Sequence, residues 1–544
     1  EIVIPSTVAS IGNKAFFGCS NLKSLIFTET PEGQTPVDLV ILDTPNGSSD
    51  NGYTNSPFYG CTSLKNIVLP ERLTVIGRLA FGGLVSGRYG EKYIPPFESI
   101  SLPSTLKEIH EMAFLNARNL KTVTFASGTT LSDACDGKAF AIGKQAFYYC
   151  TSLTEIALPT SSEATYSIGD TAFAYTGLKE ISIPKAVGWL GSGVFNRSSD
   201  LAKVVFEAGA NPKCGTSLFA YTAVSGVSLP EGVEAISDYM FQGCVNLTSV
   251  TVPASVKSIG ISAFESCQAL AKVTFATYEK DGKSYSNLIS IDNYAFSKTG
   301  ITSFTFPTLE GTKTLDLGNS LFRSCMKLET VGLSESVAEI GTAFADCFSI
   351  RSFVVDENNE NFSSKPGSPI LYNATGTAYM YICGQLPAGE YVIPEGIVSI
   401  GDNVFKGQVG ITKVVIPRSM QTIGNYAFSG CTLLETVVFE HSTDKPSQLT
   451  QKDSYGTNMF RECTSLKDVT LPANMTAIPA NMFYGCKALE SIVIPYGVTS
   501  IGQDAFGYAG LKSVSIPATV QTIANYAFEA RKDEGTIASL IFEK

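Results

Sequence analysis

The stretch "NMFYGCKALESIVIPYGVTSIGQDAF", from Asn481 to Phe506, begins and ends on the same pattern, a Met or Ala followed by Phe. An Ile-Pro pair and an Ile-Gly pair lie between the two aromatic residues. Phe483 and Phe506 are 23 residues apart. A pattern that returns at a fixed period of about 20 to 50 residues indicates a repeat array, in which similar coils stack on one another.

The same pattern recurs along almost the whole chain, in about twenty units. Aligned on this aromatic position, the units are anchored by Phe16, Phe58, Phe81, Phe114, Phe147, Phe173, Phe195, Phe219, Phe241, Phe264, Phe296, Phe322, Phe344, Phe405, Phe428, Phe460, Phe483, Phe506 and Phe528. A single unit is too short to bury its Phe. We therefore expect neighbouring units to stack at the strand spacing of about 4.8 Å, with Phe on Phe in one continuous core.

Each part of a unit predicts its own local structure. In Leu511–Pro517, apolar residues alternate with Ser513 and Ser515, which is typical of a strand with one buried face. Proline ends that strand because it has no N–H group to donate. Val498–Gly502 predicts a second, shorter strand, and Asp504–Gly510 predicts a helical or 3₁₀ turn that carries the Phe.

The segment between the short strand and the next long strand carries a family resemblance. Ile423–Cys431 and Ile259–Cys267 both contain Ile-Gly, then Ala-Phe, then Cys at fixed spacing. This compound motif resembles the BspA-like leucine-rich repeats of bacterial surface proteins, and the resemblance covers almost the whole chain apart from insertions. It implies a location at the bacterial cell surface and attachment to host matrix or other cells.

The expected fold is an α/β repeat solenoid. We predict a right-handed leucine-rich-repeat arc with a long parallel β-sheet on its concave face, and short strands and 3₁₀ or helical turns on its convex face. Residues 1–353 and 398–544 are expected to be BspA-like repeats of one continuous solenoid. Residues 354–397 lack the core Phe of the repeat pattern and look like a longer variant unit of that family. We expect them to form a small β-rich module.

Composition and charge exclude several classes of protein. The apolar content of 44% and the charged content of 16% argue against bulk disorder. A formal charge of −11 argues against nucleic-acid binding, which needs a basic surface. No apolar run reaches the length of about 18 residues that a membrane span requires, so we expect no membrane insertion. No signal peptide is present, and the chain begins and ends within a repeat, so we expect any export signal or anchor to lie outside these residues.

Most of the cysteines share one position in the repeat. Ten of the 13 cysteines do so: Cys19, Cys61, Cys150, Cys244, Cys267, Cys325, Cys347, Cys431, Cys463 and Cys486. Paired C-x-x-C spacing typical of zinc sites is absent, so no metal site is predicted. Other units carry Ala117, Ser198 or Thr222 at this position, which favours small buried thiols over a disulfide framework.

The sequence offers little for catalysis. It contains two histidines, His110 and His441, which lie about fourteen units apart in a stiff array and are not expected to share a site. A catalytic Cys–His pair at His110 would need one of the cysteines that we expect to be buried in the core. We predict no catalytic residues and no cofactor.

Insertions that follow the long strands are the candidate binding loops. We expect several of them to leave the coil at one corner and to gather along one rim. These insertions carry Tyr278, Tyr285 and Tyr455, and a separate insertion that leaves the coil at another corner carries Tyr89, Tyr93 and Phe97. These six aromatic residues are suited to protein contacts and are the candidate partner-binding residues. The residues at the outward positions of the long strands are small or β-branched. This is explained either by strand propensity alone or by a smooth surface that binds an extended polypeptide.

These observations predict a noncatalytic extracellular recognition or adhesion module. It is expected to act as a monomer and to bind a protein or glycan through the rim loops and the concave sheet; host matrix and other cells as the source of that ligand are implied by the resemblance. The alternative is an architectural spacer without a ligand. A carbohydrate-active enzyme is a distant third, because acidic residues are numerous enough to supply a carboxylate pair.

Overall fold

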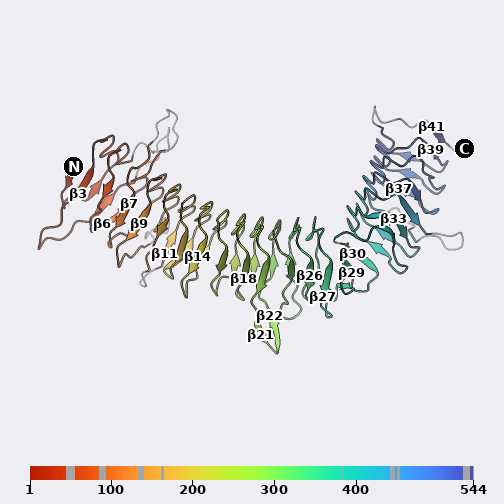
Figure 1. Ribbon diagram of the computed structural model, residues 1–544, viewed down its shortest axis with the longest axis horizontal. Helices are drawn as coiled ribbons and strands as arrows, with labels where there is room; N and C mark the ends of the chain where they lie inside the picture. Colours follow the sequence, from red (N-terminus) through yellow and green to blue (C-terminus); the bar gives the residue numbers. More distant parts are fainter. Residues whose placement is uncertain are drawn as a thin grey trace. The chain divides into compact units, whose positions relative to one another are not determined.

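The computed structural model consists of stacked coils (Figure 1). It describes residues 1–43, 56–84, 93–132, 140–160, 165–382, 384–440, 448–449, 454–530 and 539–542. The chain divides into two compact units. The first unit contains Glu1–Met326 and Glu339–Asp346, and the second contains Lys327–Ala338 and Cys347–Lys544.

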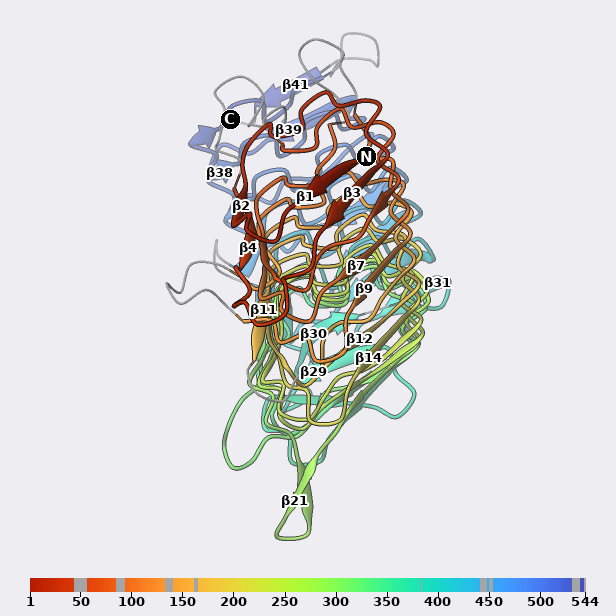
Figure 2. The same cartoon turned by 90° about the vertical axis from the view of Figure 1, so that its left-hand side faces the viewer.

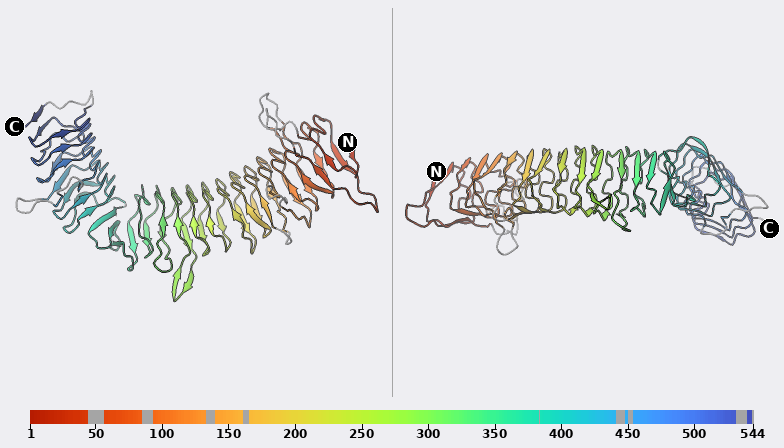
Figure 3. Two further views of the ribbon diagram at one scale, coloured as in Figure 1. Left: turned by 180° about the vertical axis from the view of Figure 1, so that it is seen from behind. Right: turned by 90° about the horizontal axis from the view of Figure 1, so that it is seen from below.

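In the first unit, most coils contribute a strand to each of two sides, which are called the long-strand and short-strand sides after the lengths expected from the sequence. The long strands are β1 (Ile2–Ile4), β3 (Ser24–Phe27), β5 (Asn66–Ile67), β7 (Ser99–Leu102), β9 (Thr122–Phe125), β10 (Glu155–Ile156), β12 (Glu180–Ile183), β14 (Lys203–Phe206), β16 (Gly226–Ser228), β18 (Ser249–Val252), β20 (Lys272–Phe275) and β24 (Ser303–Thr305). The short strands are β2 (Ser10–Ile11), β4 (Leu39–Ile41), β6 (Leu73–Ile76), β8 (Glu108–Ile109), β11 (Tyr166–Ile168), β13 (Val187–Leu190), β15 (Lys213–Cys214), β17 (Ala235–Ile236), β19 (Ser258–Ile259), β23 (Ser290–Ile291) and β25 (Asp316–Leu317). Figure 3 shows the strands of successive coils side by side from two further directions.

The second unit repeats this plan. Its long strands are β26 (Thr330–Leu333), β27 (Ser352–Val355), β31 (Gly389–Val392), β33 (Ile411–Ile416), β35 (Thr436–Phe439), β36 (Asp468–Thr470), β39 (Ser513–Ile516) and β41 (Ser539–Phe542). Its short strands are β32 (Ser399–Ile400), β34 (Thr422–Ile423), β37 (Ala477–Ile478), β38 (Ser500–Ile501) and β40 (Thr522–Ile523).

Neighbouring coils pair in parallel and in register. In the long-strand sheet, Ile181 of β12 lies opposite Val204 of β14, and both side chains point into the core. Each strand thus joins residues that hold the same place in successive repeats. The predicted parallel solenoid is confirmed within each unit.

The predicted stack of Phe side chains is present in both units. In the first unit, rings from Phe16 to Phe344 stack one on the next, with centroids 4.9–5.8 Å apart and planes within 18°. In the second unit, rings from Phe405 to Phe528 do the same at 4.7–5.7 Å. Because each ring covers the next, the coils build one apolar core along each unit.

The turns that carry these Phe residues differ from the prediction. No α-helix occurs in the residues that the structure describes, and the turns that carry the Phe residues are neither helical nor 3₁₀. Every second N–H group between residues 262 and 267 donates to the carbonyl three residues earlier, at 3.1–3.3 Å, and the others donate to carbonyls of the next coil at 2.8–3.0 Å. Positive φ at Ser262 (51°) and Ser266 (63°) turns the backbone out of a helical path. The turn is therefore a run of β-turns that also joins coils.

The block at 354–397 contains antiparallel strands. They are β28 (Phe362–Ser364), β29 (Ile370–Asn373) and β30 (Ala378–Ile382), and β30 returns to the parallel pattern by pairing with β32. Tyr379 is buried where the Phe is missing, with its ring 5.9 Å from that of Phe405. A tyrosine from the inserted strands thus extends the aromatic core.

Candidate functional site

A hairpin projects from the coils of the first unit (Figures 1 and 2). It consists of β21 (Tyr278–Lys280) and β22 (Lys283–Tyr285), which pair antiparallel with Tyr278 opposite Tyr285. The residues between the strands, Asp281 and Gly282, both have positive φ (51° and 73°). This is the backbone that a type I′ hairpin turn requires, and Asp-Gly is among its preferred sequences.

One carboxylate holds the first strand of the hairpin. The hydroxyl of Tyr278 donates to Oε2 of Glu310 at 3.0 Å, and Nζ of Lys280 forms an ion pair with Oε1 of the same residue. These contacts lower the pKa of Glu310, with the hydrogen bond from Lys280 as the largest cause. The rings of Tyr278 and Tyr285 lie 6.1 Å apart and are partly exposed. The hairpin therefore presents two tyrosines on a support attached to the following coil.

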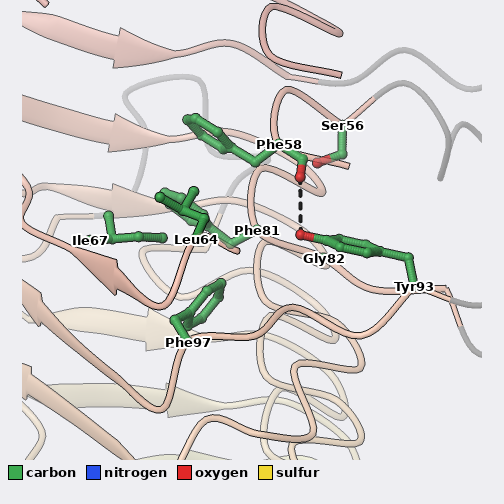
Figure 4. Close-up of a pocket in the computed structure, with 8 residues that line it drawn as sticks. All are labelled: Ser56, Phe58, Leu64, Ile67, Phe81, Gly82, Tyr93 and Phe97. Carbon is green, nitrogen blue, oxygen red and sulfur yellow. Dashed lines mark hydrogen bonds between the residues drawn. The ribbon is translucent and has the colours of Figure 1, made fainter. Parts of the chain in front are cut away.

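The other candidate residues lie elsewhere. Tyr89 is outside the described residues. Tyr93 and Phe97 are buried and line a small pocket with Phe58 and Phe81 (Figure 4). That pocket leaves no room for a water molecule, so it is packed core and not a binding site.

Tyr455 is also buried, and its hydroxyl donates to the carbonyl of Leu449 at 3.0 Å. Among the six candidates, only Tyr278 and Tyr285 are placed by the described structure at a partly exposed surface.

The buried position of Tyr93 has a specific explanation in the repeat position that most cysteines share, three residues after the core Phe. We call the cysteines at this position the ladder cysteines. The thiols of eight ladder cysteines each donate a hydrogen bond to the carbonyl of the core Phe in the preceding coil, at 3.1–3.2 Å. These residues are Cys61, Cys150, Cys244, Cys267, Cys325, Cys431, Cys463 and Cys486. The coil that follows Phe58 carries Leu84 at this position, which has no donor. The hydroxyl of Tyr93 donates to the carbonyl of Phe58 instead, at 3.0 Å. The insertion thus supplies the missing hydrogen bond.

The ladder cysteines are free thiols in the described structure. Burial raises the pKa of Cys61 and of Cys244 to about 11, and raises that of Cys150 and Cys486 further. Such thiols stay protonated near neutral pH and are poor nucleophiles or metal ligands. Ser198 replaces the thiol in one coil, and its hydroxyl donates to the carbonyl of Phe173 at 2.9 Å. This agrees with a structural role for the ladder position.

The long-strand sheet of the first unit presents small side chains outward. Thr124, Ser182, Thr251, Thr274 and Thr305 are all exposed. A shallow groove of about 690 Å³ lies on this sheet and is lined in part by Glu155, Ala157 and Glu180. Glu180 forms an ion pair with Lys203 of the next coil at 3.1 Å. The sheet therefore offers a flat polar surface whose charges are partly paired between coils.

His110 lies on the short-strand side, between two carboxylates. Its Nδ1 is 2.6 Å from Oδ1 of Asp43, and its Nε2 is 2.9 Å from Oε2 of Glu108. The hydrogen bond to Asp43 is the largest cause that raises the pKa of His110 to about 9. The other histidine, His441, falls outside the described residues. In the described part of the chain, no group of three or more His, Cys, Asp or Glu side chains is arranged to hold a metal ion.

Parallel coils, a stacked Phe core and a ladder of buried thiols define a repeat solenoid. The chain belongs to the BspA type leucine rich repeat family. The model of that family, described as a region of 6 copies, matches residues 1–34, 47–89, 91–140, 136–244, 212–286, 234–366, 383–450 and 398–533. The resemblance recognised in the sequence is confirmed. Among the described residues, the structure contains no apolar helix of membrane-spanning length.

Several solved structures are similar to this chain. A leucine rich cell surface protein from Faecalibacterium prausnitzii is 23% identical, over 72% of this chain and 88% of its own, with a TM-score of 0.39. A leucine-rich repeat protein from Bacteroides ovatus is 23% identical over 95% of this chain and 97% of its own, with a TM-score of 0.41. One from Eubacterium ventriosum is 22% identical over 58% and 83%, with a TM-score of 0.46. No curated protein matches the chain.

Proposed function

We propose that this chain is a noncatalytic recognition and adhesion module of a bacterial surface protein. It acts as a monomer and binds a protein or glycan of host matrix or of other cells. The hairpin β21–β22 is the main contact, and the long-strand sheet is a second one. The resemblance to BspA-like surface proteins supports the location.

The hairpin is the observation that carries this proposal. The stacking of the coils does not need it, because the sheets on either side pair β18 with β20 and β19 with β23 without its strands. An isolated two-stranded hairpin is marginally stable in water. The contacts of Tyr278 and Lys280 with Glu310 hold this one in place, which lowers the entropy that a partner's binding would cost.

The alternative function is a spacer that has no ligand of its own. The Phe stack within each unit and the hydrogen bonds between its coils favour it, since they make each unit a stiff array whether or not anything binds. Under this alternative, the hairpin is an insertion that drifted without selection.

Shortening the hairpin distinguishes the two functions. Residues 278–285 are replaced by Asn-Gly, which removes both tyrosines, and binding of the protein to a mixed extracellular-matrix preparation and to cultured epithelial cells is measured. We expect binding to weaken about tenfold or more, because a hot spot of one or two tyrosines commonly contributes about 2 kcal/mol. The melting temperature should not change.

The matched control shortens another exposed loop of the same unit, residues 30–35, which lies between β3 and β4. It should keep most of the binding. Unchanged attachment after both deletions, together with deletion of the other rim insertions, would support the spacer.

A further inference from the structure

The turns of the first unit carry a second surface, made of arginine and tyrosine. Tyr149 and Tyr175 stack with centroids 4.4 Å apart and planes 8° from parallel. The guanidinium of Arg197 lies over the rings of Tyr175 and Tyr221, 6.0 Å and 4.5 Å from their centroids. Arg118 lies over Tyr149 at 5.4 Å. We call these five residues the Arg–Tyr stack.

The repeat itself builds this stack. Tyr149, Tyr175, Arg197 and Tyr221 each follow the core Phe of their coil by two residues. All have positive φ, between 57° and 62°, which is uncommon for residues of this size. Register between coils then places each side chain against the one in the next coil. The stack is thus fixed by the same hydrogen bonds that hold the coils together.

The guanidinium groups of the stack are not neutralised. In the described part of the chain, no ion pair to Arg118 or Arg197 is present, whereas Arg323 pairs with Asp346 at 3.4 Å. The Nε of Arg118 is buried without a hydrogen-bond partner. Arg197 contacts the rings of Tyr175 and Tyr221 and is still an exposed residue, so part of its guanidinium group remains accessible. The N–H edge is the part of arginine that binds carboxylates in pairs.

We propose that the Arg–Tyr stack is a docking site for an acidic polypeptide segment in an extended conformation. Charge complementarity supports an anionic partner, because Arg118 and Arg197 form no ion pair in the described part of the chain; their local positive charge acts against the formal charge of −11 of the whole protein. Tyrosine and arginine together are typical of the energetic centre of protein interfaces, which favours a polypeptide over a polysaccharide. Arg118 and Arg197 are three coils apart, on the order of 15 Å, so carboxylates about four or five residues apart in an extended segment would reach both.

This site is separate from the hairpin, and its test does not depend on the proposed function. The probe is a fluorescein-labelled oligoglutamate peptide, and binding to the whole chain is followed by fluorescence anisotropy at low and at physiological ionic strength. We expect Arg197→Gln to weaken binding about tenfold or more, because a charge-assisted hydrogen-bond pair is lost. Binding should also weaken as salt increases.

Two further variants test whether the loss of binding is specific to the Arg–Tyr stack. Arg323→Gln removes the same charge from a residue that is already paired, and should change the affinity less than about twofold. Tyr221→Leu keeps the charge of Arg197 but removes one of its stacking partners, and should weaken binding severalfold. Melting temperatures check that each variant folds.

Several results would overturn the proposal. The peptide failing to bind, or Arg323→Gln weakening binding as much as Arg197→Gln, would show that no specific site exists. A sulfated polysaccharide that binds at least about tenfold more tightly than the peptide, and that depends on Arg197, would show that the partner is not a polypeptide.

Discussion

The thiol of Cys267 donates a hydrogen bond to the carbonyl oxygen of Phe241 in the preceding coil, at 3.1 Å. The same carbonyl accepts the backbone N–H of Cys244 at 3.1 Å. The buried carbonyl oxygen therefore accepts two hydrogen bonds. The second comes from a small side chain of the next coil and joins the two coils. This relationship explains why serine or an inserted tyrosine can replace cysteine, whereas the hydroxyl of Thr222 donates to the carbonyl of Phe219 in its own coil.

Substitutions at Cys267 test this explanation. Cys267→Ala leaves a small cavity and removes the hydrogen bond, and should destabilise the first unit by about 1–2 kcal/mol. Cys267→Ser keeps a donor and should cost less, as the contact of Ser198 with Phe173 indicates. Urea unfolding followed by circular dichroism gives the comparison. A serine variant less stable than the alanine variant would show that the apolar character of the buried thiol, and not its hydrogen bond, matters here.

The state of the thiols gives a second prediction. The structure describes Cys61, Cys150, Cys267 and the other ladder residues as free, and burial raises the pKa of those with a resolved shift. Without reductant, the native protein should react with iodoacetamide only slowly, and the urea-unfolded protein should be alkylated at every ladder cysteine. Peptide mass mapping checks this. Disulfide-linked ladder peptides would contradict it.

The core was predictable from the sequence, but the turns were not. The period places Phe264 and its equivalents in one stack because each must be covered by the next coil. The turn type depends on positive φ at two positions, and the Gly or Asn that favours it is absent at Ser262 and Ser266, although Gly243 and Asn481 supply it in other coils. Hydrogen bonds between coils stabilise that backbone conformation. They exist only when coils stack, so the sequence of a single repeat does not reveal them.

The candidate site was only partly predictable for a related reason. An aromatic residue in an insertion can face a partner or fold back onto the core. Tyr93 and Tyr455 fold back because a backbone carbonyl is available to each hydroxyl, which the sequence does not reveal. The hairpin had a readable signal in Asp281-Gly282 between short alternating segments. Four residues of the Arg–Tyr stack could have been found by aligning the position two residues after each Phe, whereas Arg118 lies four residues after Phe114.

Close packing of backbone between coils gives a third prediction. A Cβ atom added at Gly177 would lie 2.5 Å from the carbonyl oxygen of Thr151 in the preceding coil, whereas one added at Gly226 would meet nothing within 4 Å. Gly177→Ala should therefore destabilise the first unit by about 2 kcal/mol or more. Gly226→Ala, the matched control, should be neutral or slightly stabilising. Equal melting temperatures for the two variants would contradict the packing seen between these coils.

The ion pairs of His110 predict a dependence of stability on pH. The pKa of His110 is about 9 in the folded protein and about 6.5 in an unfolded chain, so the folded state favours the charged ring. A raised pKa contributes stability that is fully present below about pH 6.5 and is lost as the pH rises through about 9.

Loss of this contribution should lower the stability of the first unit by about 1–2 kcal/mol, a figure reduced for solvent screening because the ring is partly exposed. The melting temperature of the wild type should fall more than that of His110→Gln between about pH 6 and about pH 10. His441→Gln removes the other histidine and should behave as the wild type. Asp43→Asn, which removes the partner that contributes most to the raised pKa, should flatten the profile in the same way as His110→Gln. Parallel profiles for the wild type and His110→Gln would show that the ring is not held as a cation between Asp43 and Glu108.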